Sequence, residues 1–129
     1  MKKVDVDTLK DRFGILELWN KTLVNTTPHK ISIILQGEIL EIPAAKQPLR
    51  LKEEAEFTGI AGNIPLFRKE FLLEDDLPPE DEDGEILYIV PALVAQFFRR
   101  QRRDLVVPHG FVRDTKGNII GCEGFAFVE

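Results

Sequence analysis

The stretch EILYIVPALVAQFFRRQRR, residues 85–103, carries a strand pattern, a helix start and a basic cluster one after another. Residues 85–90 are mostly apolar and β-branched, which predicts a strand. Pro91 follows, and proline suits the first turn of a helix because its missing N–H would be unpaired there anyway. We therefore predict a helix over residues 91–103 that packs an apolar stripe onto a sheet. The predicted stripe consists of Leu93, Val94, Phe97 and Phe98.

Strand and turn patterns lie on both sides of this stretch. Residues 23–43 are rich in β-branched side chains with turn residues between them, which predicts two or three short strands. Residues 49–57 alternate apolar and charged side chains, a pattern typical of a half-buried strand. Residues 111–120, FVRDTKGNII, predict a hairpin, because Gly117 supplies the left-handed backbone that a tight turn needs.

Two further segments complete the expected organisation. Apolar residues at helical spacing in residues 1–20 predict an N-terminal helical extension whose helix is broken or ended near Gly14. Residues 74–85 are acidic and contain two prolines, which predicts an exposed loop. The length of 129 residues is that of one domain. We therefore expect a single α+β domain over residues 1–129, in which a mostly antiparallel β-sheet carries the N-terminal helix and the helix at about 91–103.

Composition excludes several classes of protein. A formal net charge of −5 argues against general nucleic-acid binding, which needs a basic surface. The longest apolar run, residues 86–95, is half of what a bilayer span needs, and the first residues do not resemble a secretory signal, so we expect a cytoplasmic protein without a membrane partner. Cys122 is the only cysteine, which excludes an internal disulfide and a cysteine-based metal site.

The basic cluster RRQRR, residues 99–103, has two interpretations. Cations at a helix C-terminus are stabilised by the helix dipole by about 0.3–1 kcal/mol each, so the cluster is explained as a solvated helix end. All four cations are arginine, however, although nine of the seventeen basic residues of the chain are lysine. The arginine fork fits phosphate oxygens in bidentate pairs, which points to a phosphorylated ligand. A third possibility is that the acidic loop, residues 74–85, pairs with the cluster.

Catalytic and metal motifs are not recognisable in the sequence. His29 and His109 each follow a proline, and either one is a structural turn residue, a ligand contact, or a general base working with Asp114. The acidic loop does not match a calcium-binding pattern, because prolines stand where the first ligand belongs. We therefore expect no catalytic residue, no metal ligand and no cofactor.

Three segments together resemble a group of small proteins encoded by bacteriophages and prophages. They are VNTTPHKISI (24–33), LYIVPALVAQFF (87–98) and VVPHGFVRDTKGNIIGCEGF (106–125), with the Asn-x-Thr-Pro-His and Val-Arg-Asp-x-x-Gly-x-Ile-Ile patterns. Thr26 and Pro91 stand where leucine and serine are common in that group. Some phage proteins of this size act as sponges that sequester nucleotide-derived signals of host immune systems such as Thoeris. The resemblance implies a non-catalytic protein that binds a cyclic ADP-ribose isomer or a cyclic oligonucleotide.

The resemblance and the arginine bias together give the expected function. We favour a phosphorylated-nucleotide site over a solvated helix end, and we expect a homo-oligomer with Phe13 and Trp19 as apolar anchors. The alternatives are a small hydrolase or nucleotide-modifying enzyme that uses His29 or His109, and an accessory interaction protein without a small ligand. The expected ligand-binding residues are Arg99, Arg102, Arg103, His109, Arg113 and His29.

Overall fold

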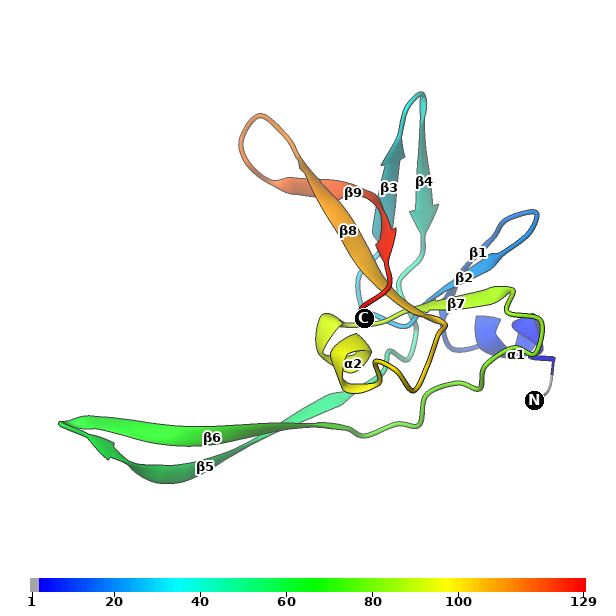
Figure 1. Cartoon of the computed structure of the whole chain (residues 1–129). Coiled ribbons are helices and arrows are strands. Elements are labelled where there is room, and N and C mark those ends of the chain that lie inside the picture. Colours follow the sequence, from blue (N-terminus) through cyan, green and yellow to red (C-terminus); the bar gives the residue numbers. More distant parts are fainter. Residues whose placement is uncertain (1–2) are drawn as a thin grey trace.

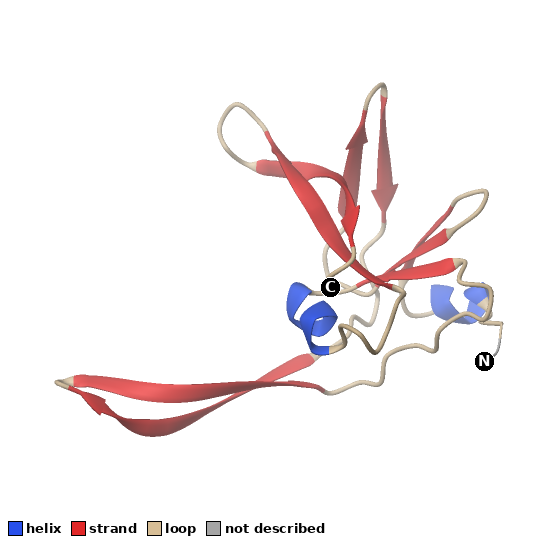
Figure 2. Ribbon diagram, in the orientation of Figure 1, coloured by secondary structure: helices blue, strands red, loops and turns tan. Residues whose placement is uncertain are grey.

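The computed structural model describes residues 3–129 and is largely β, with 48% of the residues in strands and 9% in helices. Strands dominate the ribbon in Figure 2 and the helices are small, so the expected α+β class is corrected to a mainly β fold. The elements, in chain order, are α1 (Val6–Lys10), β1 (Gly14–Glu17), β2 (Thr22–Asn25), β3 (Ile31–Leu35), β4 (Glu38–Ile42), β5 (Leu51–Ala61), β6 (Ile64–Leu73), β7 (Ile86–Ile89), α2 (Ala92–Phe97), β8 (Leu105–Arg113) and β9 (Ile119–Ala126).

Seven strands form one mixed sheet in the order β1-β2-β7-β8-β9-β3-β4. The pairs β2–β7, β7–β8 and β3–β9 are parallel and the other three are antiparallel, so the expected mostly antiparallel sheet is corrected to a mixed one. The two outer strands approach each other, which makes the sheet barrel-like and nearly closed (Figure 1). Gly14 in β1 permits this approach, because a Cβ atom there would lie 1.7 Å from the Pro43 carbonyl oxygen.

Apolar side chains fill both sides of this sheet. One cluster draws residues from six strands, including Ile42, Ile89 and Val106, and lines the interior of the barrel-like sheet. The other lies between the sheet and the helices and contains Val94 of α2 and Tyr88 of β7. Since each of these side chains is 1% exposed or less, the two clusters are the core that holds the body together.

The N-terminal segment is a shorter helix than expected. Instead of a helical extension over residues 1–20, helix α1 has five residues, and strand β1 begins at Gly14. Pairing of β1 with β2 overrides the helical spacing, because it buries this segment on the sheet. Phe13 is 5% exposed within its own chain, so it is not the surface anchor we expected, whereas Trp19 is 96% exposed.

The helix expected over residues 91–103 covers Ala92–Phe97 only. Arg100 adopts φ 70°, a left-handed conformation that a continuing helix cannot contain. Val94 and Ala95 are buried, whereas Leu93 and Phe97, which we expected on the sheet, are exposed by 43% and 67%. The arginines therefore lie after the helix end, in a turn, and not on successive turns of a helix.

Most of the other local predictions of strands and turns are confirmed. The strand predicted at 85–90 is β7, and residues 23–43 form β2, β3 and β4. Strands β8 and β9 are the predicted hairpin, and Gly117 has φ 86° at its turn. The strand predicted at 49–57 exists as β5, but the prediction that it is half-buried is wrong. Strands β5 and β6 form a separate two-stranded arm that projects from the body (Figure 1).

Candidate functional site

The four arginines of residues 99–103 have different environments. Arg102 is 15% exposed in its side chain, and its Nε and Nη2 atoms donate to the two carboxylate oxygens of Asp104 at 2.9 and 2.8 Å. Its Nη2 also donates to the Pro78 carbonyl at 2.7 Å, and Nε lies 3.1 Å from the Glu80 carboxylate. Arg102 therefore ties the turn to the acidic loop, which is the pairing we considered as an alternative to a ligand.

Tyr88 completes this attachment of the acidic loop. Its hydroxyl donates to the Pro79 carbonyl at 3.0 Å, and the Arg102 guanidinium lies 6.0 Å from its ring centroid. Burial, and next the neighbouring Asp104 carboxylate, raise the pKa of Tyr88 far above its usual range, so the hydroxyl stays a donor. Residues 74–85 are consequently a docked segment with Pro78 and Asp81 buried, and not the fully exposed loop we expected.

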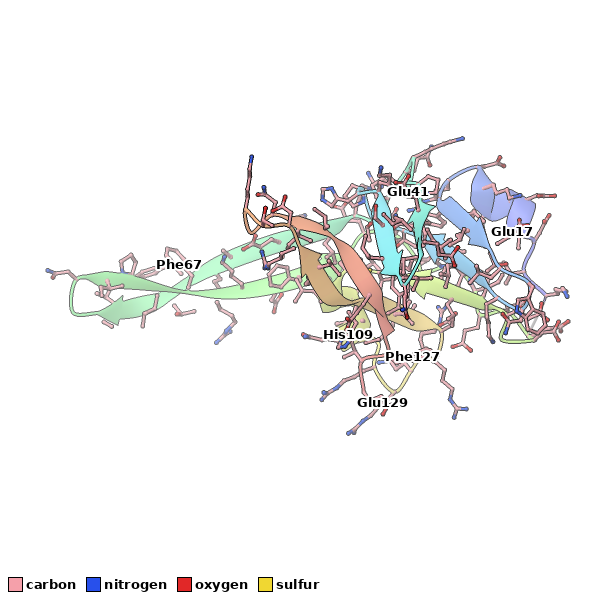
Figure 3. All side chains as sticks on the ribbon, turned by 90° about the horizontal axis from the view of Figure 1, so that it is seen from above. Glu17, Glu41, Phe67, His109, Phe127 and Glu129 are labelled. Atoms are coloured by element: carbon pink, nitrogen blue, oxygen red, sulfur yellow. The ribbon has the colours of Figure 1, made fainter. Side chains whose placement is uncertain are left out.

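The other three arginines remain available. Within the described part of the chain, only Arg102 of the four has an ion-pair partner. Arg100 and Arg103, with the paired Arg102 beside them, line a depression of about 680 Å³ together with Phe127 and Glu129, which Figure 3 labels. Arg99, which we expected at the site, does not line this depression. Phe127 is 54% exposed. Arginine forks beside an exposed aromatic ring can bind a phosphate and stack on a planar base.

Arg113 and His109 lie farther along β8. That strand begins at Leu105, beside the arginine turn, and at about 3.3 Å per residue Arg113 stands roughly 26 Å farther on. The Arg113 Nη1 atom donates to the Gly117 carbonyl at 2.9 Å within the hairpin turn. His109 is exposed midway along the strand, opposite Gly124. The structure therefore groups Arg100 with Arg103, adds Phe127, and leaves Arg113 at a different end of the hairpin.

Asp114, the carboxylate we considered as a partner for a catalytic histidine, belongs to that turn as well. Its carboxylate accepts the backbone N–H groups of Asn118 and Lys116 at 3.0 and 2.9 Å. These hydrogen bonds, the one from Asn118 foremost, lower the pKa of Asp114. A carboxylate held as an anion by its own turn is a weak proton acceptor, and its role here is to shape the hairpin.

His29 lies in the turn between β2 and β3, where the Asn-Thr-Thr-Pro-His pattern proves to be structural. The fully buried Asn25 side chain donates to the carbonyl oxygens of His29 and Pro43 at 2.8 and 3.0 Å. Its Oδ1 accepts from the Thr27 N–H and hydroxyl groups at 3.0 and 2.7 Å. Asn25 therefore joins the turn to the end of β4. The prediction from sequence missed this role, although Asn is a common turn residue.

The His29 side chain lines a second, mostly apolar groove beside Phe111 and Cys122. Cys122 is 2% exposed, and burial raises the pKa of its thiol, which keeps the sulfur protonated. A protonated thiol is a poor nucleophile, so this environment disfavours a nucleophilic role for Cys122.

Three carboxylates of the docked acidic segment come close together, those of Asp81, Asp83 and Glu85. Asp81 accepts the Val4 N–H at 2.9 Å and the Glu85 N–H at 3.3 Å, and Asp83 pairs with Lys3 at 3.2 Å. Backbone N–H groups and Lys3 therefore satisfy the carboxylates of Asp81 and Asp83. These contacts attach the N-terminal segment to the residues just before β7.

Comparisons with known proteins give no relative, since no protein-family model, curated protein or solved structure matches this chain. Within residues 3–129, neither helix has the length and apolar character needed to cross a membrane.

Proposed function

We propose that this chain is a non-catalytic binding protein that holds a phosphorylated nucleotide in the depression formed by Arg100, Arg103 and Phe127. The observation that carries the proposal is the separation of roles within one turn. Arg102 neutralises the nearby carboxylates, and Arg100 and Arg103 are left unpaired at a depression with an exposed aromatic ring.

The backbone of the turn supports a binding role. Arg100 is the only non-glycine residue with positive φ among those described, and such a conformation costs on the order of 1 kcal/mol. It breaks the helix, so Arg100 and Arg103 project from an irregular turn instead of from successive turns of one helix. Arg102 fastens this turn to the acidic segment, so the turn is held in place before a ligand arrives.

The ligand class follows from charge and from the resemblance to phage proteins. Two arginine forks suit a doubly charged phosphate or a pyrophosphate, and Phe127 offers a stacking surface for a base. The resemblance extends the proposal to a phage-encoded sponge that sequesters a nucleotide-derived immune signal, a cyclic ADP-ribose isomer or a cyclic oligonucleotide. Glu129 lies in the same depression and opposes an anion, so its charge should weaken binding.

Calorimetric titration with cyclic ADP-ribose isomers and with cyclic di- and trinucleotides tests the proposal. We expect one of these compounds to bind the parent chain and to be recovered intact after heat denaturation. Arg103→Ala and Arg100→Ala should each weaken binding by at least about tenfold, because each removes a charge-assisted contact worth about 1.5–3 kcal/mol. Glu129→Gln should strengthen it.

Arg113→Ala is the matched control, since Arg113 lies at the far turn of β8–β9. It should bind within about twofold of the parent, because a distant exposed charge is screened at physiological salt. Binding of no nucleotide by the parent, or equal losses in the Arg113 and Arg103 variants, would show that the depression is not the site. Recovery of an altered nucleotide would replace the sponge by an enzyme.

A further inference from the structure

The arm formed by β5 and β6 presents an apolar face that its own chain leaves uncovered. The register places Phe57 opposite Phe67, with the ring centroids 6.0 Å apart and the rings nearly perpendicular. Because side chains alternate between the faces of a strand, Phe71 lies on the same face as this pair, and Ile60 follows beyond the bulge. These four side chains are between 41% and 66% exposed. Figure 3 shows Phe67 far out on the arm.

The opposite face of the arm is charged over its inner half, where it carries Lys52, Glu54, Glu56, Arg68 and Glu70. Leu72 near the base and Leu66 and Ile64 near the tip lie on that face as well. On the first face the two charged residues are Glu53 and Lys69, and their side chains pair at 2.8 Å. The inner half of the arm is therefore amphipathic, and a partner on the face of Phe57 and Phe67 meets no unpaired charge of the arm.

The outer half of the arm is free of charge altogether. Residues 57–67, FTGIAGNIPLF, contain no Asp, Glu, Lys or Arg in a chain with 30% charged residues. Exposed strands of monomeric proteins usually carry charges that prevent association, and here those charges are missing where exposure is greatest. A tip of this kind is suited to burial.

A groove at the base of the same arm is suited to receive such a tip. Leu51, Leu73 and Phe71 of the arm line it together with Leu93 and Phe97 of α2. Asp75, which is paired with Arg12 and Arg50, and Asp76 line it as well. The two α2 side chains are 43% and 67% exposed. The groove therefore continues the apolar face of the arm around the corner onto the helix.

We propose that a second copy of this chain covers this surface, with the two arms packed face to face and antiparallel about a two-fold axis. An arm strand of eleven residues is about 36 Å long. Full antiparallel overlap places the tip of each arm over the base of the other. Ile60 of each copy then enters the groove beside Leu93 and Phe97 of its partner, and the same contact is made twice.

The area and the charge favour a second copy as the occupant. A large apolar side chain has about 200 Å² of surface. Multiplied by the exposed fractions of the six residues involved, this gives roughly 650 Å² of exposed apolar area per copy. That area is near the roughly 800 Å² that each partner buries in a stable interface. The arm, residues 51–73, has three cations and four carboxylates and thus a net charge of −1, although the chain carries −5. Two arms consequently meet without the repulsion that two acidic bodies would feel. The six residues are Phe57, Ile60, Phe67, Phe71, Leu93 and Phe97.

Sedimentation across a nanomolar to micromolar series, without any ligand, tests the dimer, so its outcome is separate from that of the nucleotide titration. We expect the parent to reach the mass of a dimer. Phe67→Glu puts an unpaired charge on the apolar face and should raise the dimer dissociation constant at least about 100-fold. Arg68→Glu, the neighbouring position on the charged face, should change it by less than about threefold. Circular dichroism of both variants checks that they fold.

A cross-link tests the antiparallel arrangement without disturbing the aromatic pair. Chains carrying Ile60→Cys are mixed with chains carrying Leu93→Cys and treated with a short bismaleimide. The native Cys122 is buried and should stay unmodified. We expect the covalent product to join one chain of each kind.

Three outcomes would overturn the proposal. If the parent chain stays monomeric at every concentration, a second copy does not cover the apolar face, and a different protein would be its partner. A dimer that tolerates Phe67→Glu would be held by strand edges or by the body. Cross-links that join only two Ile60→Cys chains would place the tips together and exclude the overlap of tip and base.

Discussion

Two antiparallel hairpins of similar length, β8–β9 and β5–β6, differ in what lies along their outer edges. Strand β8 pairs with β7, and β9 pairs with β3, so both edges of the first hairpin are bound into the sheet. The arm has no neighbour on either side among the described strands. Val106 in β8 is 1% exposed and Phe67 in β6 is 58% exposed, although both are large apolar residues in strands.

Because of this difference, we expect residues of the body to determine the stability of the fold and residues of the arm to determine association between chains. The body closes on itself with buried polar residues that are hydrogen-bonded, such as Asn25 and Asp104, so substitutions there should unfold the chain. Substitutions on the arm remove few contacts within the chain and should act on assembly instead. Matched residues in the two regions test this division, and the effects below run from the largest to the smallest.

Asn25 and Asn63 are the first matched pair. Asn25→Ala leaves the His29 and Pro43 carbonyls and the Thr27 groups without their partner, so we expect a loss of about 4 kcal/mol in the free energy of unfolding. Asn63→Ala, at the exposed turn of the arm, should cost less than about 0.5 kcal/mol. Urea denaturation measures both, and equal losses would contradict the division.

Arg102 and Arg68 are the second pair. Arg102→Ala leaves the Asp104 carboxylate, 10% exposed, without its bidentate partner, and should cost about 3 kcal/mol. Arg68→Ala, on the charged face of the arm, should change the free energy of unfolding by less than about 0.5 kcal/mol. If Arg102→Ala changed the free energy of unfolding as little as Arg68→Ala, the docking of the acidic segment would not depend on this ion pair.

Asp81 and Glu56 test the response to acid. The Val4 N–H foremost, and then that of Glu85, lower the pKa of Asp81 below its ordinary value of 3.8. A lowered pKa in the folded state gives stability that is present above about pH 4 and is lost as the pH falls through the folded value. Asp81→Asn should therefore cost about 2 kcal/mol at pH 7 and progressively less in acid.

Glu56→Gln on the arm is the control for that experiment. It should leave the decline of stability below pH 4 unchanged, because Glu56 is exposed in the arm. Denaturation midpoints between pH 2 and pH 7 distinguish the two substitutions. A pH profile that is the same for Asp81→Asn and the parent would contradict the assigned cause.

Of the four principal substitutions, those other than the matched controls, Phe67→Ala should have the smallest effect on a single chain. It removes the edge-on contact with Phe57, which contributes about 0.5–1.5 kcal/mol beyond the buried area, from a hairpin that pairs with no other strand of the described chain. Thermal unfolding at a concentration below dimer formation should show a shift of a few degrees at most. A larger loss would mean that the arm is part of the folding core.

The candidate site was only partly predictable. The preference for arginine drew attention to residues 99–103, and a ligand site there stays a prediction. Nothing local in the sequence shows that Arg102 is buried against Asp104 and the acidic segment. Phe127 was missed, because its approach to the arginines depends on the position of the chain end after β9. Arg113 was grouped with them since it follows soon in sequence, yet a straight strand carries it away.

The sequence by itself determined the local elements whose causes lie within a few residues. The strand at 85–90, the turn at Gly117 and the separate strands of 23–43 all follow from side-chain pattern and turn chemistry. Tertiary structure alone decided the parallel pairing of β2 with β7, the end of helix α2 near Arg100, and the projection of β5 and β6 as an arm. These features depend on contacts between residues far apart in the chain, where burial and hydrogen bonding outweigh local propensity.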